Sequence, residues 1–401
     1  MANLDKILQE LVVPKHDNST PDINGILAGY TTSASTQYVG AAGVKNIETM
    51  EPVDLDTVVS FFSCTKTMTA MAMLKLWEEG KVDLDAPAKT YLPILGEFGI
   101  IEEDQLDTDT GKLKYPAKKP EIDVTIRHLL LNNSGFAYMF TDSDYLVLHI
   151  KHKTHGGNPT PKLFTPEVMP LLFEPGTQWR YGHSMDWVGL IVQAVSGMKL
   201  SEFLKKNIFE QAGMDHCTFR IDDPSKMMKL HQRSKDQLKL LRMKPLPLRP
   251  SVDMGGQGCF GTVGDYLKFL RIWLNYGTSP DTGKRILRRE TVEYAIQNHL
   301  PDGQFVEFAT AMNINEGEFD PDGFTLAGCA YNNNDLPTGR PSGSIYWGGL
   351  ANLYFWIDFK NDCAGFFGCQ MMPYMDLKCV LGYIRFEYEA YQDLKRRRSK
   401  I

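Results

Sequence analysis

Strand-like segments lie near both ends of this 401-residue chain, and a long helical block separates them. Residues 26–32 and 37–43 predict two adjacent antiparallel strands, and three more β-rich segments fall within residues 323–371. Residues 377–394 predict a final helix. This order predicts an α+β fold: an antiparallel sheet built from both chain ends and flanked by helices, with a mainly helical domain inserted.

The predicted boundaries place residues 1–75 and 250–401 in the sheet domain and residues 76–249 in the inserted helical domain. The chain is too long for one minimal core, so one large composite domain or two domains are expected. Pockets commonly form where two such parts meet. We therefore expect the active site at their junction.

Charge and composition exclude several classes of partner. The net charge of −6 gives no reason to expect nucleic acid or an anionic membrane surface. No apolar run reaches the roughly eighteen residues that a membrane-spanning helix needs. The N-terminus lacks the basic and apolar regions of a secretory signal. Seven cysteines without a Cys-x-x-Cys pair suit free buried thiols in a reducing compartment, so a cytoplasmic protein is expected.

The chain ends in Ser399-Lys400-Ile401, directly after four basic residues. This tripeptide differs by one residue from the peroxisomal address Ser-Lys-Leu. The peroxisome is therefore the alternative location, and a frayed basic tail is the alternative interpretation of the segment.

Ser63 and Lys66 stand three residues apart, directly after the apolar residues 58–62 and at the start of a long Ala-, Met- and Leu-rich helix that Gly80 should end. Three residues are almost one helical turn, so both side chains should project to the same side. A serine hydroxyl becomes a good nucleophile when a neighbouring group takes its proton, and a desolvated lysine can do this. The spacing therefore indicates a serine nucleophile with a lysine base.

Two rival nucleophile motifs are weaker. Ser196 and Lys199 repeat the spacing, but Gly197 lies between them, close to a predicted helix end. Cys64 would point about 100° around the helix from Ser63. Ser63 is therefore the preferred nucleophile.

Two further elements complete a constellation: Tyr181-Gly182-His183, and Trp347-Gly348-Gly349 at the start of an apolar strand. With them the chain resembles the serine β-lactamase-like superfamily, in particular its class C-like branch. It is most similar to the family VIII carboxylesterases and to the fungal acyltransferases and esterases that act on statin-type side chains. Further matching text lies at residues 62–66, 76–85, 125–135, 174–176, 181–187 and 255–258.

The resemblance implies that the α+β fold is of the β-lactamase/transpeptidase-like type, and it implies a role for each element. Ser63 would be the acyl-accepting nucleophile, Lys66 would take its proton, and Tyr181 would share the proton network and reprotonate the leaving group. The backbone N–H groups of Ser63 and Leu350 would form the oxyanion hole. Gly348 and Gly349 would let substrate approach the strand edge.

Two departures from the family pattern weigh against β-lactam hydrolysis. Trp347 stands where β-lactamases and penicillin-binding proteins place the cation that holds the drug's carboxylate. His183 stands where they usually place Asn. Family VIII esterases do carry Trp-Gly-Gly.

The implied function is serine-dependent acyl transfer, as an esterase or an acyltransferase, in a setting such as secondary metabolism. The donor would be a small-molecule ester or thioester, and the acceptor would be water, an alcohol or an amine. The alternatives are a β-lactamase or peptidase-type hydrolase, or a catalytically silent binding protein. The presence of Ser63, Lys66 and Tyr181 argues against a silent protein.

We expect a mainly apolar acyl pocket with walls from Trp347, Tyr346, Phe260 and Tyr138, with ordinary core packing as the alternative for each. His183 is a further candidate for substrate binding. No metal or cofactor is expected. Three histidines have helical spacing: His149, His152 and His155. They lack a carboxylate or cysteine partner at ligand spacing, which favours a solvated loop or helix over a metal site. The glycine-rich residues 255–258 lack the strand–glycine loop–helix layout of a nucleotide-binding loop.

Overall fold

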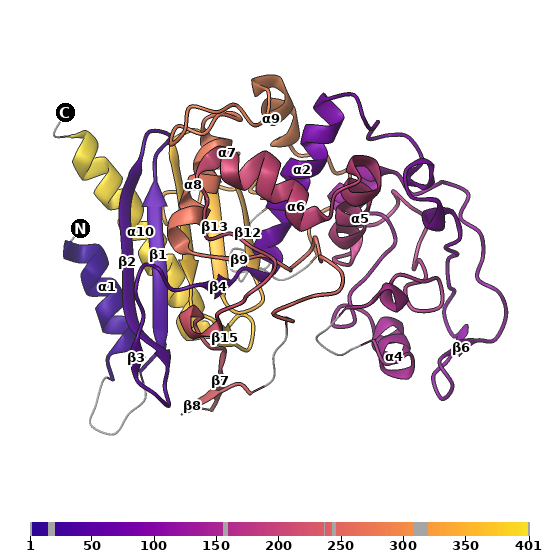
Figure 1. The fold of residues 1–401 in the computed structure, drawn as a ribbon, viewed down its shortest axis with the longest axis horizontal. Coiled ribbons are helices and arrows are strands. Elements are labelled where there is room, and N and C mark those ends of the chain that lie inside the picture. The colour runs from indigo at the N-terminus through magenta and orange to yellow at the C-terminus, as the bar shows by residue number, and fades with distance from the viewer. Residues whose placement is uncertain are drawn as a thin grey trace.

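The structure is a computed structural model that describes residues 2–14, 21–154, 159–235, 237–242, 246–307 and 320–399. Its centre is an antiparallel eight-stranded sheet with the order β10-β11-β12-β13-β14-β1-β2-β3 (Figure 1). The strands are β1 (Gly25–Thr31), β2 (Thr36–Asn46), β3 (Glu51–Pro52), β10 (Gly323–Phe324), β11 (Ala330–Tyr331), β12 (Ile345–Gly349), β13 (Leu353–Asp358) and β14 (Cys363–Gly368). Because β1 pairs with β14, strands from both ends of the chain meet in one sheet. The predicted α+β class is confirmed.

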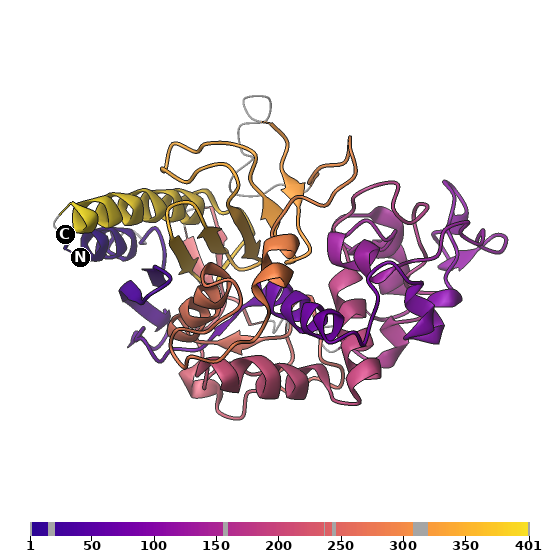
Figure 2. The same cartoon turned by 90° about the horizontal axis from the view of Figure 1, so that it is seen from above.

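Helices cover both faces of this sheet. On β13, the ring of Phe355 lies 5.5 Å from Tyr266 of α8 (Val263–Leu274), whereas Trp356 lies 6.1 Å from Tyr383 of α10 (Leu377–Arg398). Neighbouring residues of a strand point to opposite faces, so α8 and α10 lie on opposite sides of the sheet. Helix α1 (Ala2–Val12) packs beside α10, which brings the two ends of the chain together (Figure 2).

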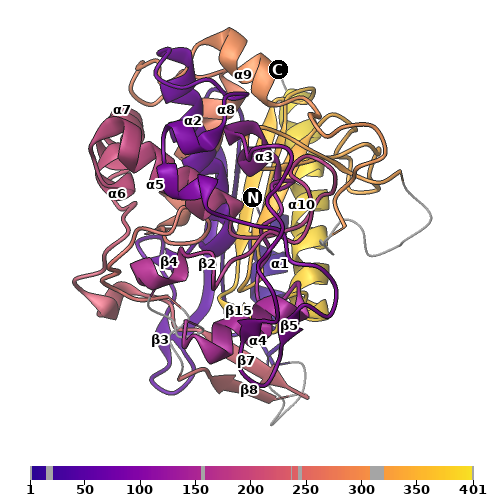
Figure 3. The same cartoon turned by 90° about the vertical axis from the view of Figure 1, so that its right-hand side faces the viewer.

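Most of the other helices belong to the middle of the chain, on the side far from α10 (Figure 2). Helix α5 packs against both α2 and α3 (Figure 3). These helices are α2 (Lys66–Glu78), α3 (Ile126–Leu131), α4 (Ser143–Lys151), α5 (Ser184–Ser196), α6 (Leu200–Leu204) and α7 (Glu210–Ala212), and α9 (Arg289–Ala295) follows later in the chain. No described helix has both the length and the apolar character needed to cross a membrane.

The described part of the chain also forms three small sheets, and two of them join segments that are far apart in the sequence. They are β15-β7-β8, β4-β9 and β5-β6. Their strands are β4 (Val59–Ser60), β5 (Leu106–Asp107), β6 (Lys112–Leu113), β7 (His231–Ser234), β8 (Gln237–Leu240), β9 (Phe260–Gly261) and β15 (Met371–Met372). Strands β7 and β8 fall within the segment expected to be mainly helical, yet β7 pairs with β15 from the C-terminal part. The proposed boundaries near residues 75 and 250 stay a prediction.

Helix α2 differs from its prediction at one end. It stops where expected, and Gly80 adopts the left-handed conformation with φ +70°. It begins at Lys66, however, and Ser63 lies before it in a 3-10 turn (Phe62–Thr65). Ser63 is therefore not held by the hydrogen bonds of the α-helix. All seven cysteines are buried and free.

Candidate active site

The turn that carries Ser63 is fixed from two sides. Phe62, directly before Ser63, is buried and has φ +48°, a conformation that is strained for a bulky residue. At the end of β12, a Cβ on Gly349 would lie 2.6 Å from the carbonyl oxygen of Phe61. Glycine is thus needed at position 349 because the backbone of β12 packs directly on the backbone of this turn. The end of β12 therefore fixes the turn that carries Ser63.

Lys66 and Tyr181 both reach the Ser63 hydroxyl. The Tyr181 Oη lies 2.6 Å and the Lys66 Nζ 3.3 Å from the Ser63 Oγ. The Lys66 Nζ also donates to the Tyr138 Oη at 3.0 Å and to the Gly256 carbonyl oxygen at 2.9 Å. Lys66 is fully buried, and three oxygens lie within hydrogen-bonding distance of its Nζ. A buried amine is therefore aimed at the serine and held by fixed polar groups.

Two aromatic residues frame Tyr181. The Trp347 Nε1 donates a hydrogen bond to the Tyr181 Oη at 3.3 Å, and the two rings lie 5.3 Å apart. On another side, the Tyr138 ring meets Tyr181 edge to face at 5.2 Å. Burial, together with the charge of Asp186, holds the pKa of Tyr138 well above its ordinary value. Tyr138 is thus a neutral phenol beside Lys66. The sequence predicted Tyr138 only as a pocket wall and did not reveal its contact with Lys66.

A buried carboxylate supports the glycine that holds Lys66. The Asp186 Oδ1 accepts the backbone N–H of Gly256 at 2.7 Å, and the Asp186 Oδ2 pairs with the His183 Nδ1 at 2.8 Å. A Cβ on Gly256 would lie 2.7 Å from the Tyr138 Oη, so only glycine fits there. Asp186 is fully buried, and both of its oxygens are occupied. The glycine loop therefore positions Lys66.

Ser63 opens into a small cavity of about 40 Å³, called here the Ser63 pocket. The expected residues Ser63, Tyr138, Tyr181, Trp347 and Leu350 all line it, together with Gly348 and Gly349. The remaining lining residues are ones that sequence reasoning missed: Phe62, Phe140, Gln257 and Tyr374. The glycine-rich residues 255–258 could have pointed to Gln257, whereas no sequence motif includes Tyr374 or Phe140.

Two expected wall residues are elsewhere. Tyr346 precedes Trp347 on β12, so its side chain points to the opposite face, where its Oη donates to Asp322 and its ring lies 4.7 Å from the Arg340 guanidinium. Phe260 is buried on β9 and borders a different groove, beside Ser60 and Met228. The expectation that Tyr346 and Phe260 line the acyl pocket is corrected.

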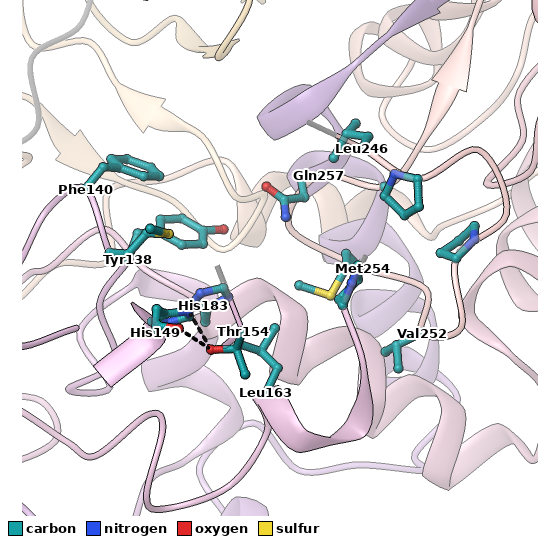
Figure 4. A pocket seen from close by; sticks show the side chains of 15 residues that line it. Tyr138, Phe140, His149, Thr154, Leu163, His183, Leu246, Val252, Met254 and Gln257 are labelled. Atoms are coloured by element: carbon teal, nitrogen blue, oxygen red, sulfur yellow. Dashed lines mark hydrogen bonds between the residues drawn. The ribbon is translucent and has the colours of Figure 1, made fainter. Parts of the chain in front are cut away.

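His183 also lies outside the Ser63 pocket. It lines a neighbouring cavity, shown in Figure 4, together with His149 and Thr154. His149 was expected on a solvated loop or helix, but it is buried on α4 and stacks on His183 with the rings 5.6 Å apart. His155 lies outside the described residues. Within the described part of the chain, no cluster of His, Cys, Asp and Glu is arranged to hold a metal ion.

Cys64 is not among the residues that line the Ser63 pocket. It is fully buried, and burial raises the pKa of its thiol. A thiol is a good nucleophile only as the thiolate, which this environment disfavours. The structure thus gives no support to the rival cysteine nucleophile.

Comparison with known proteins gives one family. The family model described as Beta-lactamase matches residues 4–377. Monacolin J acid methylbutanoyltransferase from Aspergillus terreus is 26% identical over 96% of this chain and 95% of its own length. Lovastatin esterase from Penicillium rubens is 28% identical over 86% of this chain and 88% of its own. A solved structure of a simvastatin synthase mutant from Aspergillus terreus superposes with a TM-score of 0.82, covering 98% of this chain and 95% of the other at 24% identity.

Proposed function

Because the chain belongs to the β-lactamase family, we propose that it catalyses acyl transfer through a covalent acyl-enzyme on Ser63. The observation that carries the proposal is the approach of Tyr181 Oη and Lys66 Nζ to one serine oxygen, at 2.6 Å and 3.3 Å. A hydroxyl with a buried amine and a phenol in reach has both a proton acceptor and a route for returning the proton.

In the first half of the reaction, Ser63 Oγ attacks the carbonyl carbon of an ester or thioester. Lys66 enters as the neutral amine and takes the Oγ proton, directly or through Tyr181. The bond from the carbonyl carbon to the leaving oxygen or sulfur then breaks. Tyr181 gives its proton to that atom and is reprotonated from Lys66, so the acyl-enzyme forms without net gain or loss of protons.

The charge that develops on the carbonyl oxygen needs donors. We assign the backbone N–H groups of Ser63 and Leu350, because both residues line the Ser63 pocket. Fixed backbone donors in a small buried pocket stabilise such an oxyanion strongly. The same donors serve the second half of the reaction, in which water or an acceptor attacks the acyl-enzyme.

The small volume of the Ser63 pocket, about 40 Å³, favours a short acyl group. The named relatives include an esterase and a methylbutanoyltransferase. We accordingly propose a small-molecule ester or thioester as acyl donor, and water or an alcohol or amine as acceptor. A cytoplasmic or peroxisomal setting stays a prediction, and residues 400 and 401 of the C-terminal tripeptide lie outside the described residues.

Intact-mass analysis with p-nitrophenyl butyrate tests the proposal. We expect a single butyryl adduct that maps to Ser63 and is discharged by water. Addition of an acceptor alcohol should speed its loss and yield the new ester if transfer operates. Turnover without any adduct, or an adduct on another residue, would contradict the acyl-enzyme on Ser63.

A further inference from the structure

Phe260, Ser60 and Met228 border a groove of about 370 Å³, called here the Phe260 groove. It shares no lining residue with the Ser63 pocket. Leu246 lines both the Phe260 groove and the cavity of Figure 4, which places these two spaces side by side. A cavity of about 150 Å³ accommodates a benzene ring, so the groove has room for a chain of roughly ten carbon atoms.

Two paired strands connect the groove with the turn that carries Ser63. Ser60 of β4 pairs with Phe260 of β9, and both residues line the groove. The next residue, Phe61, donates its N–H to the Cys259 carbonyl oxygen at 2.9 Å, so the pairing continues toward the Ser63 turn. A ligand in the groove would therefore contact the strand pair that leads to Ser63 without entering the Ser63 pocket.

Most of the groove is apolar. Apart from Ser60 and Phe260, its lining residues fall within residues 224–248, the segment that contains β7 and β8 (Figure 1). Unbranched methionine side chains adapt to ligands of irregular shape, and an apolar lining favours a hydrocarbon over water. The apolar side chains of this segment that line the groove include Met227, Met228, Leu230, Leu240, Leu241 and Leu248.

Both charged residues of the lining are cationic. They are Lys229 and Arg242, and no acidic residue lines the groove. Lys229 is half-buried, and its Nζ donates to the Pro224 carbonyl oxygen at 3.1 Å. This contact leaves two of its three N–H donors for water or a ligand.

The surroundings reinforce this positive charge. Arg242 pairs at 3.1 Å with Glu48, but both side chains are exposed, and such surface pairs contribute little. Residues 226–242 hold six basic residues against one acidic residue, Asp236. An excess of one sign of charge raises the local concentration of ions of the other sign. The charge of the groove therefore selects an anionic head group, and its apolar lining selects a hydrocarbon tail.

We propose that the Phe260 groove is a second ligand site that binds an alkyl carboxylate, with the chain against the apolar side chains and the carboxylate at Lys229. A neutral chain end would gain no charge-assisted hydrogen bond from Lys229. An alkyl ammonium would face two like charges, on Lys229 and Arg242. The site goes beyond the proposed acyl transfer, because it lies outside the Ser63 pocket.

Isothermal titration calorimetry with octanoate and 1-octanol tests the proposal, since the two ligands share a chain and differ in the head group. We expect octanoate to bind the wild type. In Lys229→Met, the preference for octanoate over 1-octanol should fall about tenfold relative to the wild type, because the carboxylate loses a charge-assisted hydrogen bond. The ratio is taken within each protein, so the different solvation of the two free ligands cancels.

Lys226→Met is the matched control. Lys226 belongs to the same segment, but it is exposed and does not line the groove, so this variant should keep the wild-type preference. Leu240 is a half-buried lining residue, and Leu240→Trp should fill the groove and weaken octanoate binding by about tenfold. Val252 lines the cavity of Figure 4 and not the groove, so Val252→Trp should leave octanoate binding unchanged.

Protein labelled on Ser63 with a fluorophosphonate separates the groove from the Ser63 pocket, and it should bind octanoate as the unlabelled protein does. Four results would each overturn the proposal: no octanoate binding to the wild type, loss of binding on labelling, loss of binding in Val252→Trp but not in Leu240→Trp, or an unchanged preference in Lys229→Met. Failure of Ser63 to take the label is a separate result. It would contradict the nucleophile, whereas the comparison of the variants would still decide the role of the groove.

Discussion

Tyr181 and Ser63 are 118 positions apart in the sequence, yet their hydroxyl oxygens lie 2.6 Å apart. Tyr181 reaches this place because it stands just before α5, which packs against α2, the helix that begins at Lys66. The Trp347 Nε1 contacts the Tyr181 Oη from the sheet side. Three distant segments thus meet at the hydrogen-bonded hydroxyls of Ser63 and Tyr181.

Lys66 and Tyr181 are expected to act as one proton-transfer unit. Each of Lys66→Ala and Tyr181→Phe should lower kcat for p-nitrophenyl butyrate by roughly a hundredfold or more, because each breaks the same relay. The double variant should be scarcely worse than the poorer single variant. Multiplied losses in the double variant, with all three proteins folded by circular dichroism, would show that the two residues have separate tasks.

Alanine variants of Trp347 and Tyr346 form a matched pair that tests which of the two side chains lines the acyl pocket. Trp347→Ala should enlarge the Ser63 pocket and shift the optimum of p-nitrophenyl esters toward longer acyl chains. Tyr346→Ala should leave the optimum where it is, since Tyr346 points to the opposite face of β12. The measurement is kcat/KM from acetate to octanoate. A shift caused by Tyr346→Ala and not by Trp347→Ala would refute this placement of the walls.

Trp347 also leads to a prediction about the hydrolysis of β-lactams. Its side chain is neutral where the resemblance to β-lactamases implies a cation that holds a drug's carboxylate, so nitrocefin and penicillins should be turned over little or not at all. Short aryl esters should be hydrolysed clearly under the same conditions. Nitrocefin turnover comparable to ester turnover would favour the β-lactamase alternative.

The proposed catalytic residues Ser63, Lys66 and Tyr181 could be predicted from the sequence because each stands in a short motif with a fixed order along the chain. The pocket walls could not. Whether Tyr346 or Trp347 faces Ser63 depends on the register of β12 against β13, which pairs Trp347 with Phe355 on the α8 side. The contact of Tyr138 with Lys66, and the approach of Tyr374, depend on loop packing that carries no periodic signal.

The burial of His231 leads us to expect that the stability of the folded protein depends on pH. It is fully buried on β7, its Nε2 accepts the backbone N–H of Ile47 at 3.3 Å, and burial lowers its pKa to about 4. The unfolded chain, with a histidine pKa near 6.5, binds the proton first. The contribution of neutral His231 to the free energy of unfolding is thus fully present above about pH 6.5 and is lost as the pH falls toward 4.

Urea unfolding measures this effect. The free energy of unfolding should fall by about 2 kcal/mol between pH 7 and pH 5 through His231, and His231→Gln should remove most of that fall. The glutamine side chain retains an oxygen that can accept from Ile47. The same pH dependence in both proteins would assign the effect to other groups.

The identity of the nucleophile is tested most directly by fluorophosphonate labelling of three proteins: wild type, Ser63→Ala and Cys64→Ala. We expect one label per wild-type chain, mapped by peptide mass to Ser63, no label and no ester turnover in Ser63→Ala, and labelling with most of the activity in Cys64→Ala. A folded Ser63→Ala protein that still takes the label or turns over esters would contradict the account.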